Sequence, residues 1–192
     1  MGVRAWLGER WEDAGVWAAE GRAWPPRALL LAVLAYFGAR HLADPEYGSI
    51  FSGLTLGVHE LGHLVFAPLG HWMGIAGGSL MQVLAPLALA YGFLRQRDYY
   101  AIAVAGAWEA MSLTNLAAYV ADARAEELPL VSPFGGDPEH DWHFLLDSVG
   151  MLRHDVQLAG WLRLGAFLCL AASLALGAWL CLRMARGRPA AA

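Results

Sequence analysis

The sequence has few charged residues and no lysine at all. Only 16% of its 192 residues are charged, against about 25% in a typical soluble domain, while 58% are hydrophobic. A small soluble protein needs a charged surface, so this composition disfavours that class and favours a chain whose outer surface contacts lipid. All 13 basic residues are arginine, which together with abundant alanine, glycine and leucine suggests a GC-rich bacterial genome.

Cysteine is also scarce, and basic charge is not in excess. Cys169 and Cys181 are the only two cysteines, and their spacing fits no zinc motif built from cysteine pairs. We expect both to be reduced thiols in an apolar segment. The formal net charge of -4 predicts no basic surface for nucleic acid. Early charges at Arg4, Glu9 and Arg10 interrupt any signal-peptide core, so we expect later apolar spans to insert the chain.

Long apolar stretches recur along the chain, which predicts one all-α integral membrane domain over residues 1–192. The expected fold is a polytopic helical bundle of about five or six spans in residues 27–182, followed by an Arg-rich tail at 183–192. At about 1.5 Å per residue, the stretch 48–69 is long enough to cross about 30 Å of hydrocarbon. The expected spans are 27–43, 48–69, roughly 79–94, 99–120 and 156–182.

Three other segments carry their own signals. Residues 1–26 hold four tryptophans among mixed charges, a pattern that favours the headgroup layer, so we expect an interfacial amphipathic helix there. The glycine-rich patch at residues 70–78 predicts a tight turn or a re-entrant segment. Asp137-Pro138 is typical of an N-cap followed by proline at the first helical position, and it predicts a short helix over 138–152.

Arginines near both ends of the chain indicate that both ends lie in the cytoplasm. An even number of crossings is then required, so the short helix at 138–152 would have to dip into the membrane or cross it. Arg95 and Arg97 would then fall on the wrong side. The sequence alone therefore leaves the orientation open, although the cytoplasmic membrane of a bacterium is the expected location.

The strongest chemical signal is His59-Glu60-Leu61-Gly62-His63, in the middle of the stretch 48–69. On a helix, His59 and His63 lie one turn apart on the same face, where two imidazoles can bind one zinc ion. Glu60 can reach a metal-bound water without binding the metal. Ionisable residues inside an apolar span are costly, by about 2.5–3.5 kcal/mol for a charged one, so they usually perform work. The alternative is a polar packing cluster without a metal.

The segment Thr55-Leu56-Gly57-Val58-His59-Glu60-Leu61-Gly62-His63 lies inside a span and is followed by a glycine-rich turn and another span. It resembles the site-2 protease family of intramembrane zinc metalloproteases. In that family two histidines bind zinc, the glutamate is the catalytic base, and an aspartate from a later helix is the third ligand. The resemblance implies His59 and His63 as zinc ligands and Glu60 as the base. It covers residues 50–90 well. The family's later Leu-Asp-Gly signature is absent in full, and the nearest match is Leu146-Asp147-Ser148.

A catalytic zinc site keeps three protein ligands and one open position, so a third ligand must come from another segment. The richest candidate is Glu139-His140-Asp141-Trp142-His143. We expect His140 to be the ligand, with Asp141 either replacing it or orienting a histidine, and Asp147 next in order. Alternatively, these are ordinary polar residues at a helix N-terminus, where Glu139 and Asp141 suit the helix dipole.

Three further polar residues lie inside expected spans. Glu109 could be a ligand, a partner of a ligand or the mate of an arginine. Gln82 and Asn115 could bind an extended substrate backbone, although transmembrane helices also use such residues to join helices.

The function that these residues favour is a membrane-embedded zinc metalloprotease, which hydrolyses a peptide bond of a membrane or membrane-proximal substrate with a zinc-activated water. The expected cofactor is Zn²⁺, and the expected partners are the lipid bilayer and a membrane protein or peptide substrate. The alternatives are a zinc hydrolase of a lipid or small amphipathic substrate, and a non-catalytic membrane scaffold that binds metal. Glu60 argues against the scaffold, which needs no base beside its ligands.

Overall fold

The computed structural model describes residues 2–44, 46–130 and 139–187, and every regular element in these ranges is helical. The expected all-α class is therefore confirmed. The helices are α1 (Val3–Ala19), α2 (Trp24–Ala43), α3 (Ile50–Phe66), α4 (His71–Arg95), α5 (Tyr99–Ala121), α6 (Asp141–Ser148) and α7 (Asp155–Arg186). Single 3-10 turns follow α3 and precede α7, at Ala67–Leu69 and Leu152–His154.

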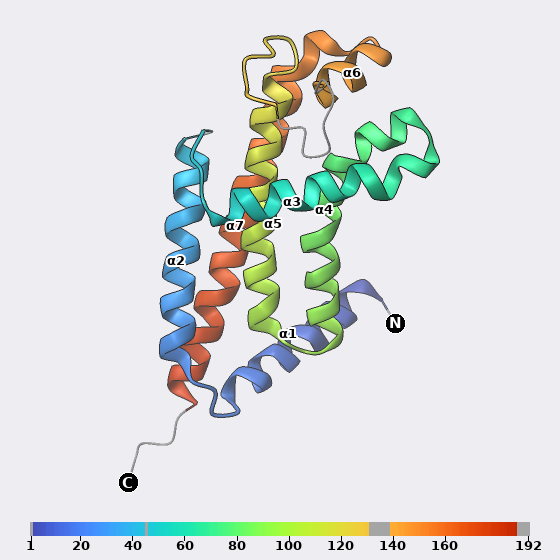
Figure 1. Cartoon of the computed structure of the whole chain (residues 1–192). Coiled ribbons are helices and arrows are strands. Elements are labelled where there is room, and N and C mark those ends of the chain that lie inside the picture. Colours follow the sequence, from blue (N-terminus) through green and yellow to red (C-terminus); the bar gives the residue numbers. More distant parts are fainter. Residues whose placement is uncertain (1, 45, 131–138, 188–192) are drawn as a thin grey trace.

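α5 and α7 form the centre of the bundle and run side by side in opposite directions, with α2 packed against them (Figure 1). Small residues allow this close packing, since Ala107 and Ala110 of α5 are buried beside Leu34 and Leu170. A Cβ atom on Gly38 of α2 would lie only 2.6 Å from the Leu170 side chain. Close approach over small residues is typical of helices that associate in a membrane, where van der Waals contact drives association.

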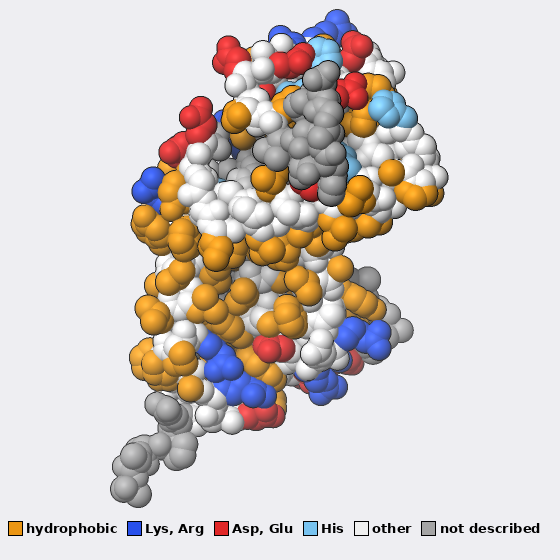
Figure 2. All heavy atoms as spheres, viewed as in Figure 1, with side chains coloured by type: hydrophobic (Ala, Val, Ile, Leu, Met, Phe, Trp, Pro, Cys, Tyr) orange, Lys and Arg blue, Asp and Glu red, His pale blue; other side chains and the backbone are white. Residues whose placement is uncertain are grey.

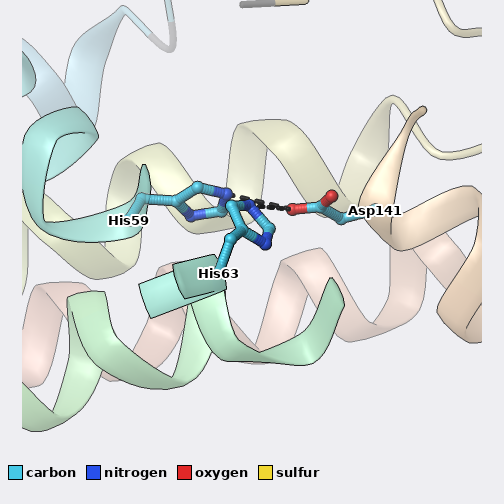
Figure 3. Close-up of side chains that lie close together, drawn as sticks. All are labelled: His59, His63 and Asp141. Carbon is cyan, nitrogen blue, oxygen red and sulfur yellow. Dashed lines mark hydrogen bonds and ion pairs between the residues drawn. The ribbon is translucent and has the colours of Figure 1, made fainter. Parts of the chain in front are cut away.

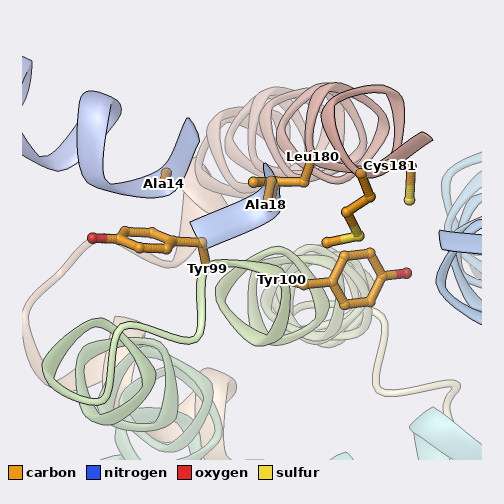
Figure 4. Close-up of a cluster of buried hydrophobic side chains, with 7 residues drawn as sticks. Ala14, Ala18, Tyr99, Tyr100, Leu180 and Cys181 are labelled. Atoms are coloured by element: carbon orange, nitrogen blue, oxygen red, sulfur yellow. The ribbon is translucent and has the colours of Figure 1, made fainter. Parts of the chain in front are cut away.

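α1 lies across one end of the bundle, where α2 begins and α7 ends (Figure 1). Its Ala14 and Ala18 enter a buried cluster with Tyr99 of α5, at the point where α5 and α7 meet α1 (Figure 4). Its Trp6 and Trp11 are exposed. A helix that caps the end of the bundle and exposes indole rings has the arrangement that an interfacial helix requires.

α3 runs across the direction of α2, α5 and α7 rather than alongside them (Figure 1). It packs closely on α4, because glycines let the two backbones approach: a Cβ atom on Gly77 would lie 2.6 Å from the carbonyl oxygen of Gly62. The glycine-rich patch at 70–78 is accordingly helical from His71 onward, and only Gly70 has a turn conformation, with φ at 104°. Its glycines mainly serve a helix–helix contact, which differs from the tight turn expected over the whole patch.

Three helical segments of the described chain are long and apolar enough to cross a membrane: Ile50–Leu69, His71–Arg95 and Leu152–Arg186. Figure 2 shows a hydrophobic band around the middle of the visible face, with charged side chains of both signs toward the α1 end and charged side chains of both signs together with histidines toward α6. Apolar length and an apolar outer band are what a lipid-facing protein requires. The five or six spans expected from the sequence stay a prediction.

Two helix boundaries differ from those expected. α6 begins after His140, which is its N-cap, and ends at Ser148, so it is shorter than the helix expected over 138–152. The expected N-cap, Asp137-Pro138, lies outside the described residues. α7 continues as a helix to Arg186, so the first part of the expected Arg-rich tail is helical.

Candidate metal site

α3 presents both motif histidines toward α4. Ser49 caps the start of α3 by accepting the N–H of Phe51 at 3.1 Å, which satisfies one of the free donors of the first turn. One helical turn then separates His59 from His63, and their ring centroids lie 4.7 Å apart. Local helix geometry alone therefore places the two imidazoles side by side.

Gly78 of α4 leaves the space that the two imidazoles occupy. A Cβ atom at Gly78 would lie 2.5 Å from Nε2 of His59 and 2.6 Å from Nε2 of His63. Ordinary contacts of a Cβ atom begin at 3.4 Å, so any side chain at this position would displace both rings. Because Gly78 lies inside α4, its role is to make room for the histidines and not to form a turn.

Asp141, the first residue of α6, completes a cluster with the two histidines (Figure 3). Its Oδ2 atom lies 3.0 Å from Nε2 of His59 and 3.3 Å from Nε2 of His63. The three potential ligand atoms all lie within 4.8 Å of one another. The side chains of His59 and Asp141 are each only 9% exposed, whereas that of His63 is 25% exposed, so the cluster is largely buried and is accessible from the His63 side.

Hydrogen bonds on the far side of each ring define which nitrogen faces Asp141. Nδ1 of His59 lies 2.7 Å from Oε1 of Gln82, and Nδ1 of His63 lies 2.9 Å from the carbonyl oxygen of Gly74. Both partner oxygens only accept, so each Nδ1 carries the proton. In a neutral imidazole the Nε2 atom then has a free lone pair. Both Nε2 atoms face the Asp141 carboxylate, so neutral imidazoles would present their lone pairs to a shared cation, whereas a proton on Nε2 would form an ion pair with the carboxylate.

Gln82 is itself held in place by α5. Its side-chain NH₂ group donates to the backbone carbonyl oxygen of Ser112 at 3.2 Å, and the Ser112 hydroxyl donates back to the backbone carbonyl oxygen of Gln82 at 2.9 Å. Gln82 and Ser112 are both buried, so these bonds have little competition from water. The orientation of His59 is therefore fixed through two helices, α4 and α5.

Tyr119 of α5 positions the backbone of Asp141. The Asp141 N–H donates to the Tyr119 hydroxyl oxygen at 3.0 Å. The carboxylate anion is the form of Asp141 that binds a metal.

His140, the expected third ligand, has a different place in the structure. Its Nδ1 atom accepts the N–H of His143 at 3.2 Å, and its Nε2 atom lies 3.2 Å from Oδ2 of Asp122. Both ring nitrogens are thus used to cap α6 and to tie it to the end of α5. Of the residues named as third ligand, the structure brings Asp141 to the histidines, whereas Asp147 is exposed farther along α6.

A cavity of about 380 Å³ opens beside the cluster. Glu60 lines it together with His59, His63 and Asp141, so the carboxylate expected to act as a base shares one space with the three candidate ligands. Asn115 also lines this cavity. The rest of its wall includes Tyr47, Leu56, Leu116, Tyr119, Leu128, Pro129 and Leu130.

Glu109 does not join the cluster. It is buried within α5, at 4% exposure, and it belongs neither to the candidate ligands nor to the cavity lining. Its Oε2 atom has no hydrogen-bond partner among the described residues. The structure therefore gives Glu109 no contact with the candidate metal site.

Several residues that shape the site were not assigned these roles from the sequence. From the sequence, Gln82 was a polar residue inside an expected span, but its contact with His59 depends on the fold. Tyr119 had no signal beyond its residue type. Gly78 did have a signal, since a glycine pair follows the histidine motif, but the pair suggested a turn. Each role became visible only when α3, α4, α5 and α6 were brought together.

Comparison of the chain with family models, with curated proteins and with solved structures found no match. The resemblance to site-2 proteases therefore rests on the residues of the motif, and the function is argued from the geometry of the site.

Proposed function

We propose that His59, His63 and Asp141 bind one zinc ion and that the protein is a membrane-embedded zinc hydrolase of peptide bonds. The observation that carries this proposal is the convergence of two imidazole Nε2 atoms on a buried carboxylate oxygen, with both Nδ1 atoms held by acceptors. Three electron-rich atoms repel one another in a site of low polarity, and a cation among them removes that repulsion. The competing arrangement replaces the metal with a proton on Nε2 of one histidine.

The distances between the candidate ligand atoms suit zinc. In a tetrahedral site with bonds of about 2.0–2.1 Å, neighbouring ligand atoms are about 3.3 Å apart. The observed separations of 3.0 and 3.3 Å from the carboxylate oxygen to the two nitrogens are close to this value. Two imidazoles and one carboxylate form a ligand set known from catalytic zinc sites, and they leave a fourth position for water or substrate.

Glu60 supports hydrolysis rather than simple metal storage. A bound zinc ion would polarise a substrate carbonyl and lower the pKa of a water molecule to about 7. Glu60 follows His59 directly and faces the same cavity, so its carboxylate can accept a proton from that water and pass it to the leaving amine. A storage or scaffold site needs no such base.

The cavity favours a substrate with both apolar and polar groups. Leu56, Leu116 and Leu128 supply apolar surface, and Asn115 can form hydrogen bonds with a peptide backbone. A cavity of about 380 Å³ accommodates a short stretch of peptide rather than a folded domain. The substrate we propose is therefore an unwound peptide segment of a membrane or membrane-proximal protein.

The bundle is proposed to cross the cytoplasmic membrane of a bacterium four times, which is fewer than the five or six spans expected from the sequence, because α3 is long and apolar enough to cross but lies across the other helices (Figure 1). α2, α4, α5 and α7 alternate in direction between the two ends of the bundle, and α3 lies across them (Figure 1). The crossings of α4 and α7 are supported by their length and apolar composition.

The proposal is tested with Glu60→Gln in the purified, zinc-loaded full chain. The variant should keep its zinc and lose peptide hydrolysis by about 100-fold or more, because an amide cannot accept the proton. Membrane peptides and lipid amides or esters are offered in parallel as substrates. If the protein hydrolyses only lipids, the proposed peptidase is instead a lipid hydrolase. If it hydrolyses none of the substrates, the proposal that it is an enzyme is refuted.

A further inference from the structure

Arginine residues gather at one end of the bundle. This end consists of α1, the start of α2, the connection from α4 to α5 and the end of α7 (Figure 1). Trp11 of α1 stacks on Trp179 of α7 with centroids 4.2 Å apart, and Asp13 lies 3.9 Å from Arg97, so these segments are in contact. The arginines of this end are Arg4, Arg10, Arg22, Arg27, Arg95, Arg97, Arg183 and Arg186.

Acidic residues gather at the opposite end. This end holds the segment after α2, the segment after α5, α6 and the start of α7 (Figures 1 and 2). Its acidic residues are Asp44, Glu46, Asp122, Glu126, Glu127, Glu139, Asp141, Asp147 and Asp155. Its arginines are Arg40, Arg124 and Arg153. The arginine end also carries the acidic residues Glu9, Glu12, Asp13, Glu20 and Asp98, so its eight arginines leave it with a net positive charge, whereas nine acidic residues against three arginines make the opposite end net negative. The hydrophobic band lies between the two ends (Figure 2).

This charge distribution determines an orientation. Arginines in short connections near helix ends are retained on the cytoplasmic side of a membrane. The exposed Trp6 and Trp11 lie at the same end, as expected of a helix in the headgroup layer. The connection that carries Arg95 and Arg97 also lies at this end, because α3 runs across the bundle. From the sequence alone, Arg95 and Arg97 fell on the wrong side of the membrane, whereas in this arrangement they lie on the same side as the other arginines of this end.

The cavity beside the metal cluster belongs to the acidic end. Its wall includes Glu46, Leu128 and Glu139, which come from the segments that connect helices there. Asp141 enters the cluster from α6, which lies at the same end (Figures 1 and 3). The cavity therefore communicates with the side opposite to the arginines.

We propose that the Arg-rich end faces the cytoplasm and that the metal cavity opens on the other side of the membrane. The substrate is then a peptide segment presented at the outer, non-cytoplasmic face, and the hydrolytic water comes from that side as well. The statement about the substrate rests on the proposed function. The orientation does not require the enzymatic activity, since it depends on the charges of the two ends and on the four proposed crossings of the bundle.

Labelling of single cysteines tests the orientation in the full chain. Glu127→Cys places a thiol in the exposed turn after α5, and Gln96→Cys places one in the exposed turn after α4. The unchanged chain is the background control, because Cys181 is buried and Cys169 is partly buried. Each protein is treated with a membrane-impermeant maleimide in intact bacterial spheroplasts and again after lysis.

The Glu127→Cys thiol should react equally before and after lysis, and the Gln96→Cys thiol only after lysis. The reverse pattern, or equal labelling of both positions in intact spheroplasts, would overturn the orientation. Zinc is measured in the same two variants. Zinc bound with reversed labelling would refute the orientation alone, whereas the expected labelling without any zinc would support the orientation and refute the proposed function.

Discussion

Replacing Gly78 with alanine should weaken zinc binding although no ligand is removed. The added Cβ atom would lie 2.5 and 2.6 Å from Nε2 of His59 and His63. Each ring must then move by about 0.8–0.9 Å, the difference from the ordinary contact limit of 3.4 Å. Ligand sets tolerate displacements of about 0.5 Å. Both rings are also held from behind, so we expect zinc affinity to fall by about 100-fold.

Zinc affinity is measured by competition with a chromogenic chelator, on protein purified in detergent. Gly92→Ala is the matched control, because Gly92 also lies in α4 and a Cβ atom there has no neighbour within 4 Å. Gly92→Ala should keep the zinc affinity of the unchanged protein. If Gly78→Ala binds zinc as tightly as Gly92→Ala does, the histidines do not meet at Gly78 and the geometry of the site is wrong.

Four other substitutions probe the proposed ligand Asp141 and the residues around the site. Gln82→Leu removes the acceptor of the His59 Nδ1 proton, and zinc affinity in the same competition assay should fall by about 10- to 100-fold. Asp141→Ala should abolish stoichiometric zinc binding, whereas His140→Ala should retain one zinc per chain; the opposite result in metal analysis would make His140 the ligand. Tyr119→Phe leaves the Asp141 N–H without its acceptor, which should destabilise the fold by about 1–3 kcal/mol in thermal or denaturant unfolding.

The histidine pair could be predicted from sequence because its geometry is local. Residues four apart on any helix share a face, so His59 and His63 needed only the correct assignment of a helix. The third ligand could not be predicted in the same way. His140 and Asp141 are adjacent, and the choice between them depends on Asp122, which engages His140 across a separation of 18 residues.

The direction of α3 relative to its neighbouring helices could not be predicted from the sequence either. Length and apolar composition predict that a helix is compatible with lipid, but they carry no information about its angle to its neighbours. That angle depends on the contact of Gly62 with Gly77 in α4. The same contact explains why a glycine-rich patch that suggested a turn is a helix. The angle of α3 and the helical conformation of the glycine-rich patch both depend on the packing of α3 against α4, which the sequence alone does not give.

The central claim is tested most directly by counting zinc ions per chain. The full-length protein, His59→Ala, His63→Ala and the matched control His154→Ala are purified after growth with zinc and analysed by mass spectrometry of the metal. His154 is a suitable control because its side chain lies at the start of α7 and contacts Gln157 instead of the cluster. We expect one zinc per chain in the unchanged protein and in His154→Ala, and none in the other two variants. An unchanged protein without zinc, or retention of zinc by His59→Ala and His63→Ala, would contradict the account.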